Sequence, residues 1–223
     1  MPTTAERQAT FVAVPTLHVV TTDDVVMRDT FLTAATAIMR RAGPRVAVHL
    51  RAPRLDARTI HDLALLLAVV QDETGAWLVI YERVDIAVAC GARGVQLTST
   101  SLAPAQARSI APDLLAGASA HSVDQVLAAA RDGAAWVVLD RVLHAAPAAD
   151  PERGPDRLVR AARAVDIPVI ALGGIRPHHV AALRQLGARG IAAIRGVWDA
   201  PNAEAAAIDY LSAYDAGGIA RSG

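Results

Sequence analysis

Short apolar runs rich in β-branched residues recur along the whole chain, and each is followed by a longer amphipathic segment. We predict a strand in each of these runs, at residues 16–21, 45–50, 77–81, 94–97, 114–118, 136–139, 168–172 and 190–194. Most are apolar at nearly every position, as strands covered on both faces are. The segments that follow predict helices at 28–41, 59–72, 84–90, 104–110, 123–131, 157–165, 177–186 and 203–214. Strand–helix repeats of this number predict an α/β fold, the (β/α)8 or TIM barrel.

The residues after the first predicted strand separate this fold from its main alternative. A doubly wound open sheet usually has a glycine-rich fingerprint at this point, whereas this chain has Thr22, Asp23 and Asp24. We therefore predict a single barrel domain over residues 11–216, with flexible segments at 1–10 and 217–223. Asp23 and Asp24 are expected in a turn and a helix cap and not as metal ligands.

The charge balance narrows the class of ligand. The chain has 22 basic and 22 acidic residues, so no net charge attracts nucleic acid or anionic lipid. Every basic residue is an arginine, which excludes chemistry through a lysine Schiff base. The longest apolar run, residues 63–70, is far shorter than the ~20 residues of a membrane span. We expect a cytoplasmic protein with a small ligand, no nucleic-acid partner and no membrane contact.

A glycine pair follows the seventh predicted strand. Gly173 and Gly174 let the backbone approach a ligand closely, and Pro177 suits the first turn of the next helix. In barrels of this class the loops after strands seven and eight often bind phosphate through backbone N–H groups. Arg195 and Gly196 follow strand eight at the matching place. We predict a phosphate site at these four residues; a tight turn with no ligand is the alternative.

His121 follows the fifth predicted strand, at the rim where barrel enzymes place their chemistry. An imidazole can accept and donate protons, so His121 is the candidate catalytic acid and base. In the alternative reading, Ser122 caps the next helix and His121 only flanks it.

Polar residues also end the second, third and fourth predicted strands. His49 and Arg51 are two positions apart and therefore share one side of the sheet. If that side is the barrel mouth, Arg51 can grip a carboxylate or phosphate and His49 can hydrogen-bond a ring nitrogen. Tyr81 and Gln96 are expected at the same rim as further substrate contacts, whereas Arg83 and Asp85 favour pairing at a helix start. Since no histidines, cysteines or carboxylates have metal-ligand spacing, we predict no metal.

Several segments together resemble the superfamily of thiamine phosphate synthases and TenI proteins, and more closely the TenI-type thiazole tautomerases. The segments are residues 17–24 (LHVVTTDD), 49–51 (HLR), 83–87 (RVDIA), 94–97 (GVQL), 120–122 (AHS), 168–175 (PVIALGGI) and 187–192 (GARGIA). The resemblance implies a (β/α)8 barrel in which Gly173, Gly174, Arg195 and Gly196 hold the phosphate of a small phosphorylated heterocycle. It also implies tautomerisation of a carboxythiazole phosphate in thiamine biosynthesis by His121, with no cofactor; a homodimer is possible.

The synthases of this superfamily join a thiazole phosphate to hydroxymethylpyrimidine diphosphate with the help of Mg²⁺, and this activity is the first alternative. The chain departs from their pattern, because His49, Pro53 and the pair Tyr81-Glu82 replace their glutamine, lysine and asparagine-aspartate. Ser101 stands in place of their metal-binding aspartate, and a hydroxyl lacks the anionic oxygen that Mg²⁺ favours. Arg195 replaces a small residue beside the phosphate and could strengthen or fill the anion site. The second alternative is therefore a divergent, non-catalytic binding protein.

Overall fold

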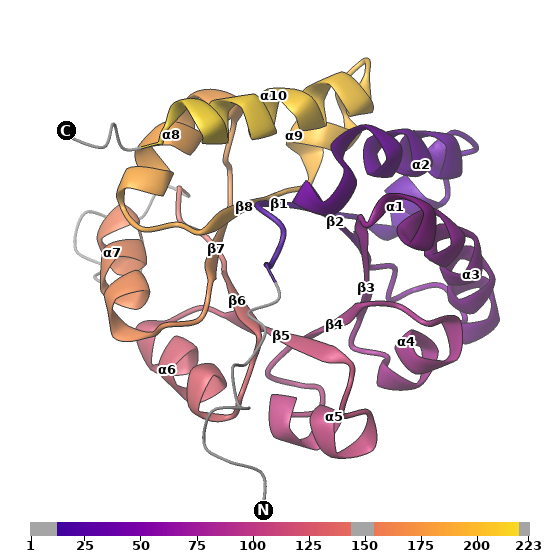
Figure 1. Cartoon of the computed structure of the whole chain (residues 1–223), viewed down its shortest axis with the longest axis horizontal. Helices are drawn as coiled ribbons and strands as arrows, with labels where there is room; N and C mark the ends of the chain where they lie inside the picture. Colours follow the sequence, from indigo (N-terminus) through magenta and orange to yellow (C-terminus); the bar gives the residue numbers. More distant parts are fainter. Residues whose placement is uncertain (1–12, 144–153, 219–223) are drawn as a thin grey trace, which may run out of the picture.

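The structure, a computed structural model, describes residues 13–143 and 154–218; the predicted flexible segment 1–10 and residues 219–223 of the predicted tail lie outside this part. Eight parallel strands pair in chain order and the last pairs with the first, which closes the barrel (Figure 1). The predicted single-domain TIM barrel is confirmed. Its strands are β1 (Leu17–Val20), β2 (Val46–Leu50), β3 (Trp77–Tyr81), β4 (Gly94–Leu97), β5 (Leu115–Ala120), β6 (Trp136–Leu139), β7 (Val169–Leu172) and β8 (Gly190–Ala193).

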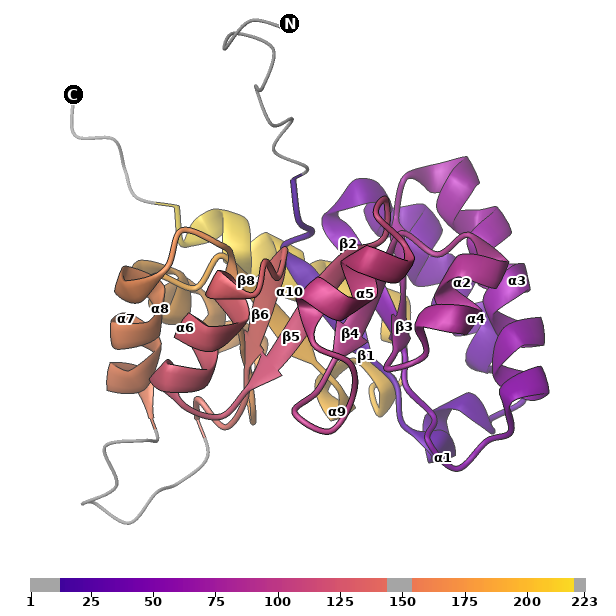
Figure 2. The same ribbon diagram turned by 90° about the horizontal axis from the view of Figure 1, so that it is seen from below.

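Helices surround the sheet, and each strand leads into at least one of them (Figures 1 and 2). They are α1 (Asp23–Val26), α2 (Phe31–Ala42), the 3-10 turn η1 (Gly43–Arg45), α3 (Ala57–Thr74), α4 (Val84–Cys90), α5 (Pro104–Ile110), α6 (Val123–Arg131), α7 (Pro155–Ala164), α8 (Pro177–Gln185), α9 (Arg195–Trp198) and α10 (Ala203–Ala216). No helix in the described part of the chain combines the length and apolar character needed to cross a membrane.

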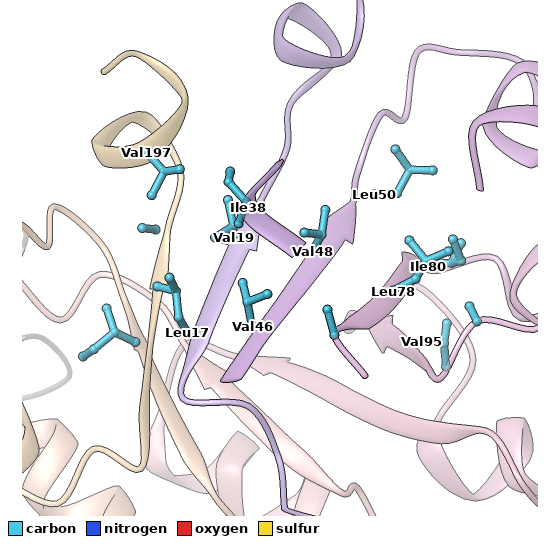
Figure 3. Packing of buried hydrophobic residues seen from close by; sticks show 14 of the residues in the cluster. Leu17, Val19, Ile38, Val46, Val48, Leu50, Leu78, Ile80, Val95 and Val197 are labelled. Carbon is cyan, nitrogen blue, oxygen red and sulfur yellow. The ribbon is translucent and has the colours of Figure 1, made fainter. Parts of the chain in front are cut away.

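Alternation along the strands sends one set of side chains outward to the helices. Figure 3 shows Val46, Val48 and Leu50 of β2 together with Val19 of β1 and Ile38 of α2, all members of one buried apolar cluster. These residues belong to the large apolar layer between sheet and helices. Because side chains alternate along a strand, Ala47 and His49 point to the barrel interior. Burial on both faces explains why the strands have near-continuous apolar sequences.

The interior side chains fill the barrel around two tryptophans, which are the first residues of β3 and β6 and so lie toward the amino-terminal ends of the strands. Trp77 and Trp136 meet edge to face with ring centroids 6.0 Å apart. A Cβ at Gly117 would lie 2.0 Å from the indole of Trp136, and one at Gly94 would lie 2.9 Å from the same ring. The glycines of β4 and β5 therefore provide the space that this indole occupies. These large rings fill the amino-terminal end of the barrel interior, which we call the barrel floor, and leave the carboxyl ends of the strands for a pocket.

Some predicted boundaries were wrong. Strand β5 continues to Ala120, two residues past its predicted end, because Ser119 and Ala120 pair with β6. The helix predicted from residue 28 begins at Phe31 as α2, and Asp23 and Asp24 begin a separate short helix, α1, instead of forming a turn. Thr22 caps that helix by accepting from the backbone N–H of Val25. Helix α9 was not predicted, because its four residues are too few for a periodic pattern.

Candidate active site

A pocket of about 480 Å³ opens at the carboxyl ends of the strands. This end is the lower edge in Figure 2, where α1 and α9 follow β1 and β8. All the residues that the sequence predicted for the site line it: His49, Arg51, Tyr81, Gln96, His121, Gly173, Gly174, Arg195 and Gly196. Closure of the barrel therefore collects residues from six strands around a single cavity.

The loops after β7 and β8 form one wall. Gly173 and Gly174 have φ values of 116° and 69°, which side chains rarely adopt. The carbonyl of Gly173 accepts a hydrogen bond from the N–H of Leu143, and this bond connects the turn to the loop after β6. Gly196 has a different reason for being glycine, because a Cβ there would lie 2.0 Å from the phenol oxygen of Tyr210. The glycine pair is required by backbone conformation, and Gly196 by packing.

Two arginines line the same wall. Arg195 begins α9, and Arg176 lies directly before α8. Neither forms an ion pair with the residues that the structure describes. Sequence analysis missed Arg176, although its place just after the glycine pair was an available signal. The wall thus combines left-handed glycine backbone with two guanidinium groups, a set suited to an anion.

His121 and Asp140 stand at the ends of β5 and β6. Nδ1 of His121 lies 4.0 Å from Oδ2 of Asp140, with side-chain exposures of 53% and 31%. Ser122 caps α6 by accepting from the N–H of Gln125, and the side chain of Gln125 accepts from the N–H of His121. Ser122 therefore caps α6, as the alternative interpretation predicted, but His121 also lines the pocket. Sequence analysis did not select Asp140, because only the closed barrel brings it beside His121.

Arg157 of α7 lies beneath this pair and is 1% exposed. Its guanidinium donates to the backbone carbonyls of His121 and Asp140. One buried side chain therefore joins the loop after β5 to the loop after β6. The two residues at the pocket rim are held in a fixed relation by the helix below them.

His49 points into the barrel and is 1% exposed. Its Nε2 lies 2.8 Å from Nδ1 of His18, and Nε2 of His18 lies 3.0 Å from the carbonyl oxygen of Pro15. Burial lowers the pKa of His18 from 6.5 to about 4, against a smaller opposing effect of the Pro15 hydrogen bond. Burial and the neighbouring His18 place the pKa of His49 well below its ordinary value. Both imidazoles are neutral near pH 7.

Gln96 belongs to a second buried chain of hydrogen bonds. The indole N–H of Trp136 donates to Oε1 of Gln96 at 2.8 Å, and Nε2 of Gln96 donates to the Ser119 hydroxyl at 3.0 Å. Because an indole can only donate, the amide orientation of Gln96 is fixed. The amide of Gln96 therefore serves the barrel floor as well as the pocket.

Arg51 and Tyr81 face each other on neighbouring strand ends. The guanidinium of Arg51 lies 5.0 Å from the ring centroid of Tyr81, a cation–π contact. The backbone of Arg51 is fixed by Thr21, whose hydroxyl accepts from its N–H and donates to its carbonyl. The Arg51 head group is half-buried at the pocket edge and is positioned to receive an anion.

The acidic residues that follow β3 take part in structural contacts. Arg83 and Asp85 form a two-point ion pair at the start of α4, which confirms the helix-start interpretation. This pair raises the pKa of Arg83 and lowers that of Asp85. Glu82 accepts a hydrogen bond from the hydroxyl of Thr98. Among the residues the structure describes, no group of three histidines, cysteines or carboxylates could hold a metal ion.

Comparisons with known proteins identify the family of the chain. Residues 17–197 match the family model described as thiamine monophosphate synthase. The chain belongs to this family. It is 36% identical to the thiamine-phosphate synthase of Roseiflexus castenholzii over 163 residues, which is 72% of each chain. It is 34% identical to that of Methanoculleus marisnigri over 164 residues, or 72% of this chain and 78% of the relative.

A solved structure agrees with this assignment. The thiamine phosphate pyrophosphorylase of Pyrococcus furiosus superposes with a TM-score of 0.79 at 25% identity, covering 93% of this chain and 98% of the other. The chain is thus a family member with the family fold. The named relatives are synthases, so the comparisons give the predicted tautomerase subgroup no specific support.

Proposed function

We propose that the pocket binds a phosphorylated thiamine precursor with its phosphate on the β7 and β8 loops, and that His121 moves a proton on the bound ring. The activity is that of a thiazole tautomerase, which converts a carboxythiazole phosphate to its aromatic form. The observation that carries this proposal is the His121–Asp140 pair in the pocket that also contains the glycine turn. An imidazole can accept the proton and return it elsewhere, and the Asp140 carboxylate favours the charged form in between.

The other end of the substrate is assigned to Arg51. Its guanidinium can hold a carboxylate through two parallel hydrogen bonds, and its backbone is fixed by Thr21. Arg176 and Arg195 can neutralise the phosphate dianion at the opposite wall. With both anionic ends held, the ring lies between them, within reach of the rim where His121 stands. Proton transfer needs no group beyond these side chains.

The names of the relatives favour a second candidate, thiamine-phosphate synthase. The resemblance of the sequence implies Mg²⁺ for that reaction, and the residues present fit the ion poorly. Asp140 is the one carboxylate among the described residues lining the pocket. Ser101, at the place of the family's metal-binding aspartate, uses its hydroxyl to hydrogen-bond the carbonyl of Thr98. The residues lining the pocket therefore do not support a Mg²⁺-dependent step.

The test is to incubate the purified protein with the non-aromatic carboxythiazole phosphate and to follow aromatisation by ultraviolet absorbance. We expect turnover, with kcat reduced about 100-fold or more in His121→Ala. Asp140→Asn should lower kcat by about tenfold with little change in KM, because it removes stabilisation of the charged imidazole. His61→Ala, on the outer surface of α3, is the matched histidine control and should react at the wild-type rate. Equal rates for wild type and His121→Ala would contradict the proposed role.

A parallel assay separates the candidates. Thiazole phosphate and hydroxymethylpyrimidine diphosphate are supplied with Mg²⁺, and pyrophosphate release is measured. Enzyme-dependent release of pyrophosphate would assign the chain the synthase activity instead of the tautomerase activity. Binding of the carboxythiazole phosphate without turnover in either assay would assign the chain to the non-catalytic alternative.

A further inference from the structure

The buried pair His18 and His49 has a fixed direction of hydrogen bonding. It begins at the carbonyl oxygen of Pro15, which lies 3.0 Å from Nε2 of His18 and can only accept. Nε2 of His18 must therefore carry the hydrogen. A neutral imidazole has one N–H, so Nδ1 of His18 is an acceptor.

The direction continues through the second ring. Nδ1 of His18 lies 2.8 Å from Nε2 of His49, so Nε2 of His49 must donate. The same count of hydrogens leaves Nδ1 of His49 bare, with its lone pair free to accept. That atom makes no hydrogen bond within the described part of the chain, and it is not among the solvent-inaccessible polar atoms. Since His49 lines the pocket, its free acceptor is available to a ligand.

We infer that His18 is a positioning residue that locks His49 in one tautomer, so that His49 presents the pocket ligand with a hydrogen-bond acceptor only. The ligand group opposite His49 is consequently one that carries an N–H or O–H, such as an amino or hydroxyl substituent. An ionised carboxylate or a ring nitrogen without hydrogen is rejected there, because two acceptors face each other. The expectation that His49 hydrogen-bonds a ring nitrogen is thereby restricted to a nitrogen that carries hydrogen, and the carboxylate is left to Arg51.

The restriction of His49 to one tautomer adds a ligand contact to the proposed function, and it does not depend on the reaction. It acts at the β2 side of the pocket, whereas the phosphate and the proton transfer are assigned to the β5 to β8 side. A failure of catalysis would leave the tautomer of His49 unchanged. The tautomer is a property of the ligand-free protein and can be measured directly.

The first test is nitrogen-15 NMR of the histidine side chains between pH 6 and 8, where protonated and bare ring nitrogens have well-separated shifts. We expect both His18 and His49 with hydrogen on Nε2 and none on Nδ1. His18→Leu removes the acceptor and should populate the other tautomer of His49. His18→Asn keeps an acceptor near the Nδ1 position and should retain the wild-type tautomer even if the leucine variant folds poorly. A wild-type His49 with hydrogen on Nδ1, or a folded His18→Leu variant with unchanged signals, overturns the inference.

The second test compares two thiazole-ethyl phosphates that differ only in an amino or a methyl substituent on the ring. The groups have nearly the same volume, but only the amino group donates. We expect the amino compound to bind wild type about fivefold more tightly, the effect of one net hydrogen bond. The preference should disappear in His49→Ala and persist in His61→Ala. Equal affinities in the wild type overturn the predicted selectivity.

A different result would mark failure of the phosphate site. If neither compound binds and inorganic phosphate shifts the NMR signal of no pocket residue, the proposed function fails. The NMR measurement still decides the tautomer in that case.

Discussion

Arg157 donates a hydrogen bond to the backbone carbonyl of His121 across 36 positions of sequence, from a helix to the rim of the barrel. The same guanidinium reaches the carbonyl of Asp140. The two loops of the proposed catalytic pair thus share one buried cation, and their relative position depends on α7.

Replacing Arg157 should therefore affect stability and catalysis together. Arg157→Met buries a side chain that cannot donate and leaves the carbonyls of His121 and Asp140 without their charged donor, which should lower the free energy of unfolding by about 3 kcal/mol. Arg157→Lys keeps one donor and should recover part of that loss and part of kcat. Urea unfolding and the tautomerase assay measure the two effects. Arg163→Met, at an exposed position of the same helix, should change stability by less than about 0.5 kcal/mol; a loss as large as that of Arg157→Met would contradict the special role of Arg157.

Arg176 and Arg195 should act on substrate affinity. Arg176→Ala and Arg195→Ala should each raise KM by about tenfold, or about 1.4 kcal/mol, with kcat nearly unchanged, because the phosphate is held equally before and during proton transfer. Steady-state kinetics give the two parameters. Arg189→Ala, exposed just before β8 at the opposite end of the barrel, is the control. Tighter binding in Arg195→Ala would mean that this side chain fills the anion site instead of strengthening it.

Gly117 should tolerate no side chain. A Cβ there would lie 2.0 Å from the indole of Trp136, so Gly117→Ala forces the ring and its bond to Gln96 to move. We expect a loss of about 1–3 kcal/mol in the free energy of unfolding, measured in urea. Gly91→Ala is a useful comparison, since its Cβ would meet open space while its φ of 71° still strains the backbone. Unchanged tryptophan fluorescence in Gly117→Ala would show that the floor adapts without moving Trp136.

Acid should destabilise the protein through the buried histidines. The pKa of His18 is about 4 in the folded chain and 6.5 as an ordinary histidine. Above pH 6.5 the ring is neutral in both states and costs nothing; between pH 6.5 and 4 only the unfolded chain takes up the proton. The free energy of unfolding should fall by roughly 3 kcal/mol over that window, with a further fall from His49, whose pKa is also lowered.

Urea midpoints from pH 8 to 4 measure this dependence. The double variant His18→Phe with His49→Leu should show a much flatter profile if it folds, and His18→Asn a partly flattened one. A wild-type profile that stays level from pH 6.5 to 4.5 would contradict the buried neutral pair.

Much of the fold and of the pocket lining follows from sequence because both depend on local signals. Strand–helix alternation predicts the barrel, and parallel strands bring their carboxyl ends to one rim. Residues such as Gly173, Arg51 and His121 could therefore be placed at the pocket by counting from strand ends. The roles proposed for them do not follow from that placement and stay predictions.

The features that sequence analysis missed depend on contacts between distant segments. Arg157 looks like any charged residue of an amphipathic helix until its burial is seen. The His18–His49 pair depends on the register of β1 against β2, in which Val20 is opposite His49. Asp140 becomes significant only once β6 lies beside β5. Tertiary contacts that local patterns do not encode thus determine how the pocket is held.

Tyr210 of α10 hydrogen-bonds the carbonyl of Ile175 and packs where a Cβ of Gly196 would lie. The match to the family model ends at residue 197, before this helix. The two loops proposed to bind the anion therefore rest on a helix that the family-model match does not include. Evolutionary drift in this terminal helix would be able to retune affinity for phosphorylated compounds while every residue of the family motifs stays the same.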